Sequence, residues 1–134
     1  MIVLDSSFLI GFYNASDAHH EAAAGLMGQI IEGDFGQAYL LEYVFLEVVT
    51  VLRMRLGHAQ AVSVGRTLLR ARELEFVPCS PVFPEAFELF GSHRDSELSL
   101  ADAAIASVAR REAPGWIATF DEDFRSVPGV APLP

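Results

Sequence analysis

Two kinds of hydrophobic spacing alternate along the chain. Short runs of consecutive apolar residues are typical of buried strands, and they occur at residues 2–4, 37–41, 75–78 and 116–119, with a last short candidate at 129–131. Longer stretches place an apolar residue every three or four positions, as one face of a helix requires, at residues 6–13, 19–32, 42–56, 58–73, 81–93 and 98–112. Strands and helices are therefore expected in alternation.

This alternation predicts an α/β fold, a three-layer α/β/α sandwich around a central parallel sheet. The 134 residues suffice for one domain, residues 1–134, and no linker or repeat divides them. In open parallel sheets, ligands bind beyond the carboxyl ends of the strands, where the strand order reverses. Asp5 directly follows the strand predicted at 2–4, and Asp121 follows the one at 116–119 after a single phenylalanine. These two acids are the first candidates for a functional site.

The kinds of charged residue in the chain exclude several classes of catalysis. The chain has 18 acidic and nine basic residues, a formal net charge of −9, and every base is an arginine. Because there is no lysine, Schiff-base catalysis and the lysine-dependent phosphate loop are excluded. Cys79 is the only cysteine, which excludes an intrachain disulfide and a multi-cysteine zinc motif.

No segment of the sequence predicts a membrane or export function. The most apolar stretch, residues 39–52, is too short to cross a bilayer and contains two glutamates. The first residues carry no basic segment of the kind that opens a secretory signal. We therefore expect a cytoplasmic protein without a membrane partner.

Glu47 interrupts the apolar face of the helix predicted at 42–56. Its neighbours at helical spacing include Tyr43 and Val51, and none of them is a cation. Burying an unpaired carboxylate costs several kcal/mol, so the side chain needs a cation, a proton or water. One interpretation is a functional acid, and the other is a boundary glutamate that turns to solvent.

Asp102 repeats this pattern in the helix predicted at 98–112, where no cation lies on its face. Ser99 and Asp102 also match the capping box, in which a hydroxyl and an acid three residues apart satisfy the first backbone groups of a helix. Asp5, Asp121 and Asp123 likewise have an ordinary alternative as cap or turn residues. Each acid taken alone leaves both interpretations open.

Taken together, the acids favour a metal site. If both helices present Glu47 and Asp102 to the strand ends, four carboxylates share one pocket, and their repulsion must be neutralised by protons or divalent cations. Oxygen ligands alone favour hard cations such as Mg²⁺ or Mn²⁺. Such ions activate water and stabilise the oxygens of a phosphoryl displacement, so the predicted chemistry is phosphodiester hydrolysis.

Four segments of the chain resemble the PIN-domain nucleases, in particular the VapC-type toxins of toxin–antitoxin pairs. They are IVLDSSFLI, LLEYVFLEVVTVLRMRLG, LSLADAAIASVARR and ATFDEDFR, and they occur in the order and at the spacing of that family. The resemblance implies an α/β/α sandwich and a Mg²⁺- or Mn²⁺-dependent ribonuclease that leaves 5′-phosphate and 3′-hydroxyl ends. By position it also implies an acidic quartet, an auxiliary acid and a small polar residue that contacts a metal-bound water or a phosphate. These are Asp5, Glu47, Asp102 and Asp121, then Asp123, then Ser7.

The resemblance further implies three partners: an RNA substrate, an antitoxin that silences the enzyme, and a second copy of the chain in a homodimer. The net negative charge is unusual for a nucleic-acid enzyme. Arg53, Arg55, Arg110 and Arg111 are the candidates for a local basic rim. The aromatic residues at helical spacing, among them Phe83, Phe87 and Phe90, are expected in the core or at a dimer contact.

Two other functions fit part of the pattern. A PIN-like interaction module would keep the fold without catalysis. An aspartate-based phosphatase or phosphotransferase would use Asp5, but such enzymes also need a lysine, and the haloacid-dehalogenase type has a second aspartate where this chain has Ser7.

Overall fold

The computed structural model describes residues 1–134. The strands are β1 (Ile2–Leu4), β2 (Ala38–Leu41), β3 (Leu74–Val77), β4 (Trp116–Ala118) and β5 (Ala131–Leu133). The α-helices are α1 (Ser6–Tyr13), α2 (His20–Ile31), α3 (Glu42–Leu56), α4 (His58–Arg70), α5 (Phe83–Ser92) and α6 (Leu100–Ala109). Two short 3-10 helices complete the chain, η1 (Ser80–Val82) and η2 (Glu122–Ser126).

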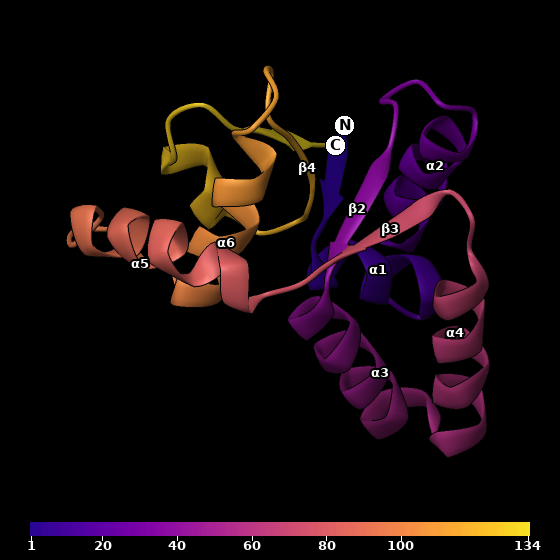
Figure 1. Ribbon diagram of the computed structural model, residues 1–134. Coiled ribbons are helices and arrows are strands. Elements are labelled where there is room, and N and C mark those ends of the chain that lie inside the picture. The colour runs from indigo at the N-terminus through magenta and orange to yellow at the C-terminus, as the bar shows by residue number, and fades with distance from the viewer.

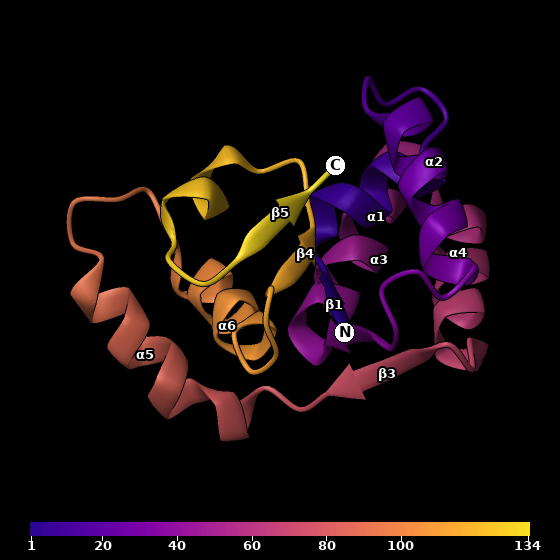
Figure 2. The same cartoon turned by 90° about the horizontal axis from the view of Figure 1, so that it is seen from above.

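The five strands form one parallel sheet in the order β3-β2-β1-β4-β5. Helices α5 and α6 cover one face of the sheet, and α1 to α4 lie on the other (Figure 1 and Figure 2). The predicted three-layer α/β/α sandwich is confirmed. None of the helices combines the length and the apolar composition needed to span a bilayer.

Strand β1 lies at the centre of the sheet, and all three of its residues are buried, as expected for a strand covered on both faces. The chain adds β2 and β3 on one side of β1 and then places β4 on the other side. The strand order therefore reverses between β1 and β4. The backbone N–H of Asp5 donates to the Ala118 carbonyl at 3.0 Å, which holds the carboxyl ends of these two strands together.

The predicted elements all form, and the differences lie at their ends. In the segment 81–93 the sequence predicts a helix from about Pro84, and α5 begins at Phe83, directly after the separate helix η1; each has a proline in its first turn. The helix predicted at 58–73 ends at Arg70, because Ala71 has an extended backbone that leads into β3. The last strand lies at Ala131–Leu133 instead of 129–131, since Gly129, with φ of +83°, turns the chain just before it.

Candidate functional site

Asp5 lies buried at the end of β1, and its carboxylate is held by hydroxyl groups. The Ser7 hydroxyl donates to Asp5 Oδ2 at 2.8 Å, and the Thr119 hydroxyl donates to the same oxygen at 2.7 Å. Although Asp5 precedes α1, its carboxylate accepts no backbone N–H from the first turn of that helix, as a capping residue would. The alternative of a simple helix cap is therefore wrong for Asp5.

Ser7 and Thr119 connect the ends of β1 and β4. The Ser7 oxygen accepts the Phe120 backbone N–H at 2.9 Å, and the Thr119 oxygen accepts the Asp121 backbone N–H at 2.9 Å. Ser7 thus has a structural partner on each side, and its predicted contact with a metal-bound water or a phosphate stays a prediction. Thr119 was not predicted as a site residue, because threonine is an ordinary strand residue. Its position two residues before Asp121 was the available signal.

Asp102 forms the capping box that the sequence predicts, and its role as a functional acid stays a prediction. Its backbone N–H donates to Ser99 Oγ at 3.0 Å, and its Oδ2 accepts the Ser99 N–H at 3.0 Å, which forms the complete capping box at the start of α6. This cap begins α6 at Leu100, two residues later than predicted. The capping hydrogen bonds fix the Asp102 carboxylate close to the acids that follow β4.

Asp102, Asp121 and Asp123 come together from two parts of the fold. One carboxylate oxygen from each of the three lies within 4.8 Å of the other two. Asp121 also caps η2, since its Oδ1 accepts the Asp123 backbone N–H at 2.9 Å. Three half-buried carboxylates at this separation offer only oxygen donors, which is the donor set that Mg²⁺ and Mn²⁺ prefer. The residues present therefore fit a hard divalent cation.

Glu47 lies in the second turn of α3 and is half-buried. Its Oε2 atom is buried and has no hydrogen-bond partner. The alternative of a boundary glutamate turned to solvent does not hold for this oxygen. Glu47 and Asp5 lie outside the three-acid group in which all distances are within 4.8 Å.

Tyr43 lies near three of the candidate acids. Burial raises the pKa of the Tyr43 phenol well above its ordinary value, and the charges of Glu47, Asp5 and Asp102 raise it further. Tyr43 is fixed at the start of α3 because its backbone N–H donates to Cys79 Sγ at 3.4 Å. Its place one turn before Glu47 was visible in the sequence, but its proximity to three acids was not.

Desolvation and neighbouring acids raise the pKa values of Asp102 and Asp123, as expected where negative charges lie close together. Burial raises the pKa of Asp102 above its ordinary value; hydrogen bonds from Ser99 offset part of this increase, and the charges of Asp121 and Asp5 add to it. Desolvation raises the pKa of Asp123 as well, with further contributions from Asp121 and from Glu97. Glu97, in the loop before α6, is an acid of this region that the sequence pattern did not indicate.

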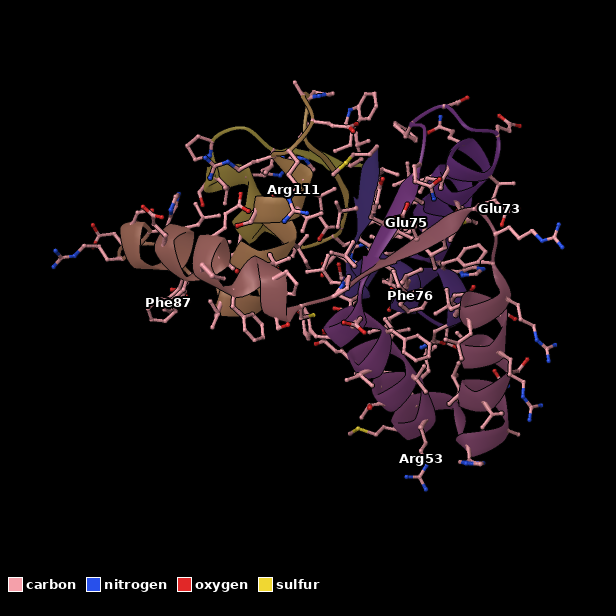
Figure 3. All side chains as sticks on the ribbon, in the orientation of Figure 1. Arg53, Glu73, Glu75, Phe76, Phe87 and Arg111 are labelled. Carbon is pink, nitrogen blue, oxygen red and sulfur yellow. The ribbon has the colours of Figure 1, made fainter.

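No cation of the protein neutralises these acids. The ion pairs of the chain join the N-terminus to Glu112, Arg55 to Asp17, Arg111 to Glu85 and Arg125 to Glu122. Among the arginines predicted to form a basic rim, Arg53 projects into solvent at the far end of α3 (Figure 3). Arg111 is paired 3.7 Å from Glu85 instead.

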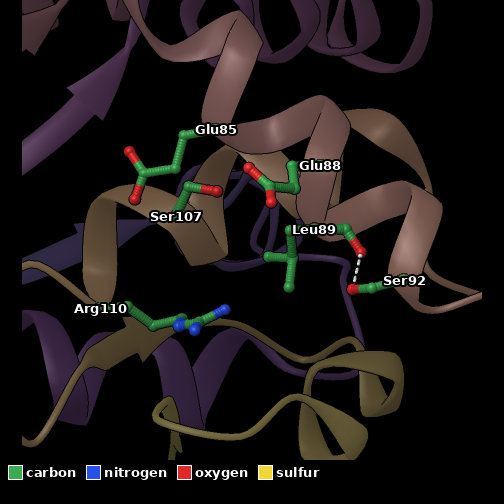
Figure 4. A pocket seen from close by; sticks show the side chains of 6 residues that line it. All are labelled: Glu85, Glu88, Leu89, Ser92, Ser107 and Arg110. Atoms are coloured by element: carbon green, nitrogen blue, oxygen red, sulfur yellow. Dashed lines mark hydrogen bonds between the residues drawn. The ribbon is translucent and has the colours of Figure 1, made fainter.

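Arg110 lines a different cavity, between α5 and α6. This cavity has a volume of about 420 Å³ and is lined by Glu85, Glu88, Leu89, Ser92, Ser107 and Arg110, so none of the five candidate acids faces it (Figure 4). The Ser107 hydroxyl in its wall is buried and has no hydrogen-bond partner. A contact of Arg110 with RNA stays a prediction.

Comparison with known proteins identifies relatives of this fold. A family model described as the PIN domain matches residues 2–130. The chain is similar to the structure of Mycobacterium tuberculosis VapC20, described as a sarcin–ricin loop cleaving toxin, with a TM-score of 0.79 and 26% identity over 94% of each chain. A toxin–antitoxin complex from Klebsiella pneumoniae shares the fold, with a TM-score of 0.62 and 17% identity over 98% of this chain and 96% of the other. None of the curated proteins matches the chain.

Proposed function

Since the matching family model spans residues 2–130, the chain belongs to the PIN-domain family, and we propose that it is a metal-dependent endoribonuclease. The observation that carries this proposal is the convergence of Asp102, Asp121 and Asp123 within 4.8 Å, without a paired cation. Three carboxylates that repel one another are stable together when a divalent cation lies among them.

The residues that would hold Mg²⁺ or Mn²⁺ are Asp102 and Asp121, together with Asp5, and Asp123 would assist. When bound, the ion supplies Lewis-acid stabilisation of the negative charge on a phosphodiester under attack by water. Asp5 enters this set in a fixed orientation because Ser7 and Thr119 both donate to its Oδ2. Fixing a ligand in this way raises the affinity of a site for its metal.

Glu47 has a separate role in the proposed reaction. Its unpartnered Oε2 is a free acceptor, so Glu47 orients the attacking water and accepts its proton. Water adds to phosphorus as the bond to the 3′ oxygen breaks, the leaving 3′ oxygen takes a proton from solvent, and Glu47 later releases its proton to solvent. The products carry 5′-phosphate and 3′-hydroxyl ends.

We further propose that the protein is the toxin of a toxin–antitoxin pair. The similarity to VapC20 over 94% of each chain supports this assignment. The antitoxin would inhibit the enzyme with a cationic side chain, an arginine, that competes with the metal for the carboxylates. Action in the cytoplasm stays a prediction.

A homodimer is proposed through the outer face of α5 and the start of α6. Phe83, Phe87 and Leu100 are 56%, 64% and 42% exposed, and with Pro84 they line an apolar hollow of about 390 Å³. Figure 3 shows Phe87 projecting outward from α5. The phenylalanines at these positions are predicted to lie in the core or at a dimer contact, and their exposure favours the contact. Light scattering after gel filtration should give a dimer for the wild type and a monomer for Phe87→Glu.

The deciding experiment incubates the purified protein with total cellular RNA, in Mg²⁺ and in EDTA, and sequences the fragment ends. We expect cleavage in Mg²⁺, and no cleavage in EDTA or with Asp102→Asn. Absence of cutting by the wild type, or cutting that survives both EDTA and the substitution, would refute the nuclease. End-sequencing also identifies the RNA that is cut.

A thermal-shift titration with Mn²⁺ separates the enzyme from a non-catalytic PIN-like module. We expect the wild type to be stabilised by Mn²⁺ and Asp5→Asn to lose most of this stabilisation. Indifference of both proteins to the metal would favour the interaction module. An aspartate-based phosphatase would instead release phosphate from a small phosphomonoester.

A further inference from the structure

The charges of this protein are unevenly distributed along the chain. Residues 48–72 contain five of the nine arginines and no acid, so they carry a charge of +5 while the rest of the protein carries −14. These residues form the outer part of α3, the whole of α4 and the two residues that follow it. We call residues 48–72 the α3–α4 arm.

The α3–α4 arm begins at the candidate active site and extends away from it. Glu47 lies on the second turn of α3, and the same helix continues to Leu56 before Gly57, with φ of +94°, turns the chain back into α4. Helices α3 and α4 pack side by side, with Arg53 at the far end of α3 (Figure 1 and Figure 3). The axial rise from Glu47 to Arg53 is about 9 Å. The α3 part of the arm therefore continues directly from the site, and α4 packs beside it.

The arginines of the arm are exposed and almost entirely without acidic partners. All five are exposed, and their one ion pair is the contact of Arg55 with Asp17, at 4.0 Å. Arg66 and Arg70 lie one turn apart on α4. Together with the hydroxyl-bearing Ser63 and Thr67 they line an open hollow of about 270 Å³.

Helix stability does not explain this arrangement. Cations near a helix C-terminus interact favourably with the helix dipole, which accounts for Arg53, Arg55 and Arg70. The helix dipole does not account for Arg66, because Arg66 lies one turn before Arg70 and the two like charges repel. Nor does the dipole account for the first turn of α4, where it favours acidic residues and none is present. The chain has twice as many acidic as basic residues, yet none of the acidic residues lies among these 25.

We propose that the α3–α4 arm binds the sugar–phosphate backbone of the RNA substrate outside the bond that is cut, with Arg66 and Arg70 as its principal phosphate contacts. This inference rests on the proposed ribonuclease function. Guanidinium groups form bidentate pairs with phosphate oxygens, and a hydroxyl such as that of Ser63 can donate to the same oxygens, whereas the Thr67 hydroxyl already donates to the Ser63 carbonyl at 3.0 Å. The carboxylates of the site and the net charge of −9 repel RNA, whereas the five arginines of the arm attract its phosphates.

The test measures RNA binding separately from cleavage. A fluorescently labelled, single-stranded 20-nucleotide RNA of mixed sequence is titrated with protein in EDTA, at several KCl concentrations, and binding is followed by anisotropy. Arg66→Ala/Arg70→Ala should weaken binding about tenfold at low salt. It should also reduce the slope of log affinity against log salt by about 1.4, since each lost phosphate contact on a single strand removes about 0.7. The control Arg94→Ala/Arg111→Ala changes the charge equally, lies outside the arm and should leave the slope unchanged.

A cleavage assay in Mn²⁺ compares the same 20-nucleotide RNA with a dinucleotide, whose single phosphate belongs to the bond that is cut, so that no phosphate remains for the arm. The arm variant should lose about tenfold in kcat/KM on the long RNA and keep the wild-type value on the short one. If the wild type cuts neither RNA, the proposed function fails, while the anisotropy titration still decides the role of the arm.

Three results would overturn the inference: no measurable binding of the 20-nucleotide RNA by the wild type, an unchanged salt slope in Arg66→Ala/Arg70→Ala, or the same reduction in the control variant. Poly-glutamate of equal charge is titrated in parallel. If it binds as tightly as RNA and loses affinity equally in the arm variant, the surface takes an acidic protein and not RNA.

Discussion

Thr119 donates its hydroxyl proton to Asp5 Oδ2 at 2.7 Å, and its oxygen in turn accepts the Asp121 backbone N–H at 2.9 Å. One buried side chain thus sets the position of an acid after β1 and of an acid after β4. The two acids belong to neighbouring parallel strands, whose carboxyl ends meet at the reversal of strand order. The relative placement of Asp5 and Asp121 therefore depends on a hydrogen-bonding residue between them as well as on the sheet.

We expect Thr119→Val to reduce the affinity for Mn²⁺ by about 10- to 100-fold, because it removes the hydroxyl and preserves the shape. The unfolding free energy should fall by about 1 kcal/mol, since Asp5 keeps its bond from Ser7. Isothermal titration with Mn²⁺ and chemical denaturation measure the two effects. Thr119→Ser keeps the hydroxyl and should bind Mn²⁺ nearly as the wild type does; equal losses in both variants would contradict this role.

The two acids at strand ends were predictable because a parallel sheet brings the ends of its strands to one edge, whatever the details of packing. For Asp102, the capping box could be predicted from the sequence, but the closeness to Asp121 could not. Its capping box depends on local geometry within three residues, whereas its approach to Asp121 depends on how α6 packs on the sheet. Glu97 carried no signal, and the only signal for Thr119 was its position two residues before Asp121, because a threonine at a strand end and a glutamate in a loop are ordinary residues.

Glu47 and Glu42 allow a matched comparison on one helix. Glu47 Oε2 is buried without a partner, whereas Glu42 is exposed and its Oε1 accepts the Cys79 backbone N–H at 3.2 Å. We expect Glu47→Gln to lower kcat/KM by on the order of 100-fold or more, because the proton acceptor is lost. Glu42→Gln should change kcat/KM less than about twofold, as a surface substitution outside the site does.

Stability in EDTA gives Glu47→Gln a second readout. The substitution replaces a carboxylate that has a buried, unpartnered oxygen with a neutral amide, so the melting temperature should not fall below that of the wild type. A variant that loses activity because it unfolds would instead melt lower. That outcome would assign Glu47 to the structure and not to the reaction.

The raised pKa of Asp102 makes the stability of the metal-free protein depend on pH. Because its pKa in the folded protein lies above the ordinary value of 3.8, the folded state holds this proton to higher pH than the unfolded chain does. The contribution of Asp102 to the unfolding free energy therefore falls as the pH rises from about 3.8 through the folded pKa, and the full cost is present at neutral pH.

Asp102→Asn removes this cost and keeps an oxygen that accepts the Ser99 N–H. At pH 7 in EDTA the variant should be more stable than the wild type by about 0.5 kcal/mol, a value that allows for solvent screening at a half-buried site. The difference should shrink as the pH falls below about 3.8, where the wild-type carboxyl becomes protonated in both states. In saturating Mn²⁺ the order should reverse, because only the wild type gains the full binding energy. A difference that is constant from pH 3.5 to pH 7 would refute the electrostatic explanation.

Ser107, on α6 in the wall of the cavity between α5 and α6, offers a test of how burying an unpaired hydroxyl affects stability. Its hydroxyl is buried in α6 without a hydrogen-bond partner, whereas the nearby Ser92 hydroxyl donates to the Leu89 carbonyl at 2.9 Å (Figure 4). An unmade hydrogen bond leaves the cost of desolvation uncompensated, so Ser107→Ala should raise the unfolding free energy by about 1 kcal/mol. Ser92→Ala removes a bond that is made and should not stabilise. Denaturant titrations of both variants measure the difference, and a loss of stability in Ser107→Ala would mean that its hydroxyl is hydrogen-bonded in solution.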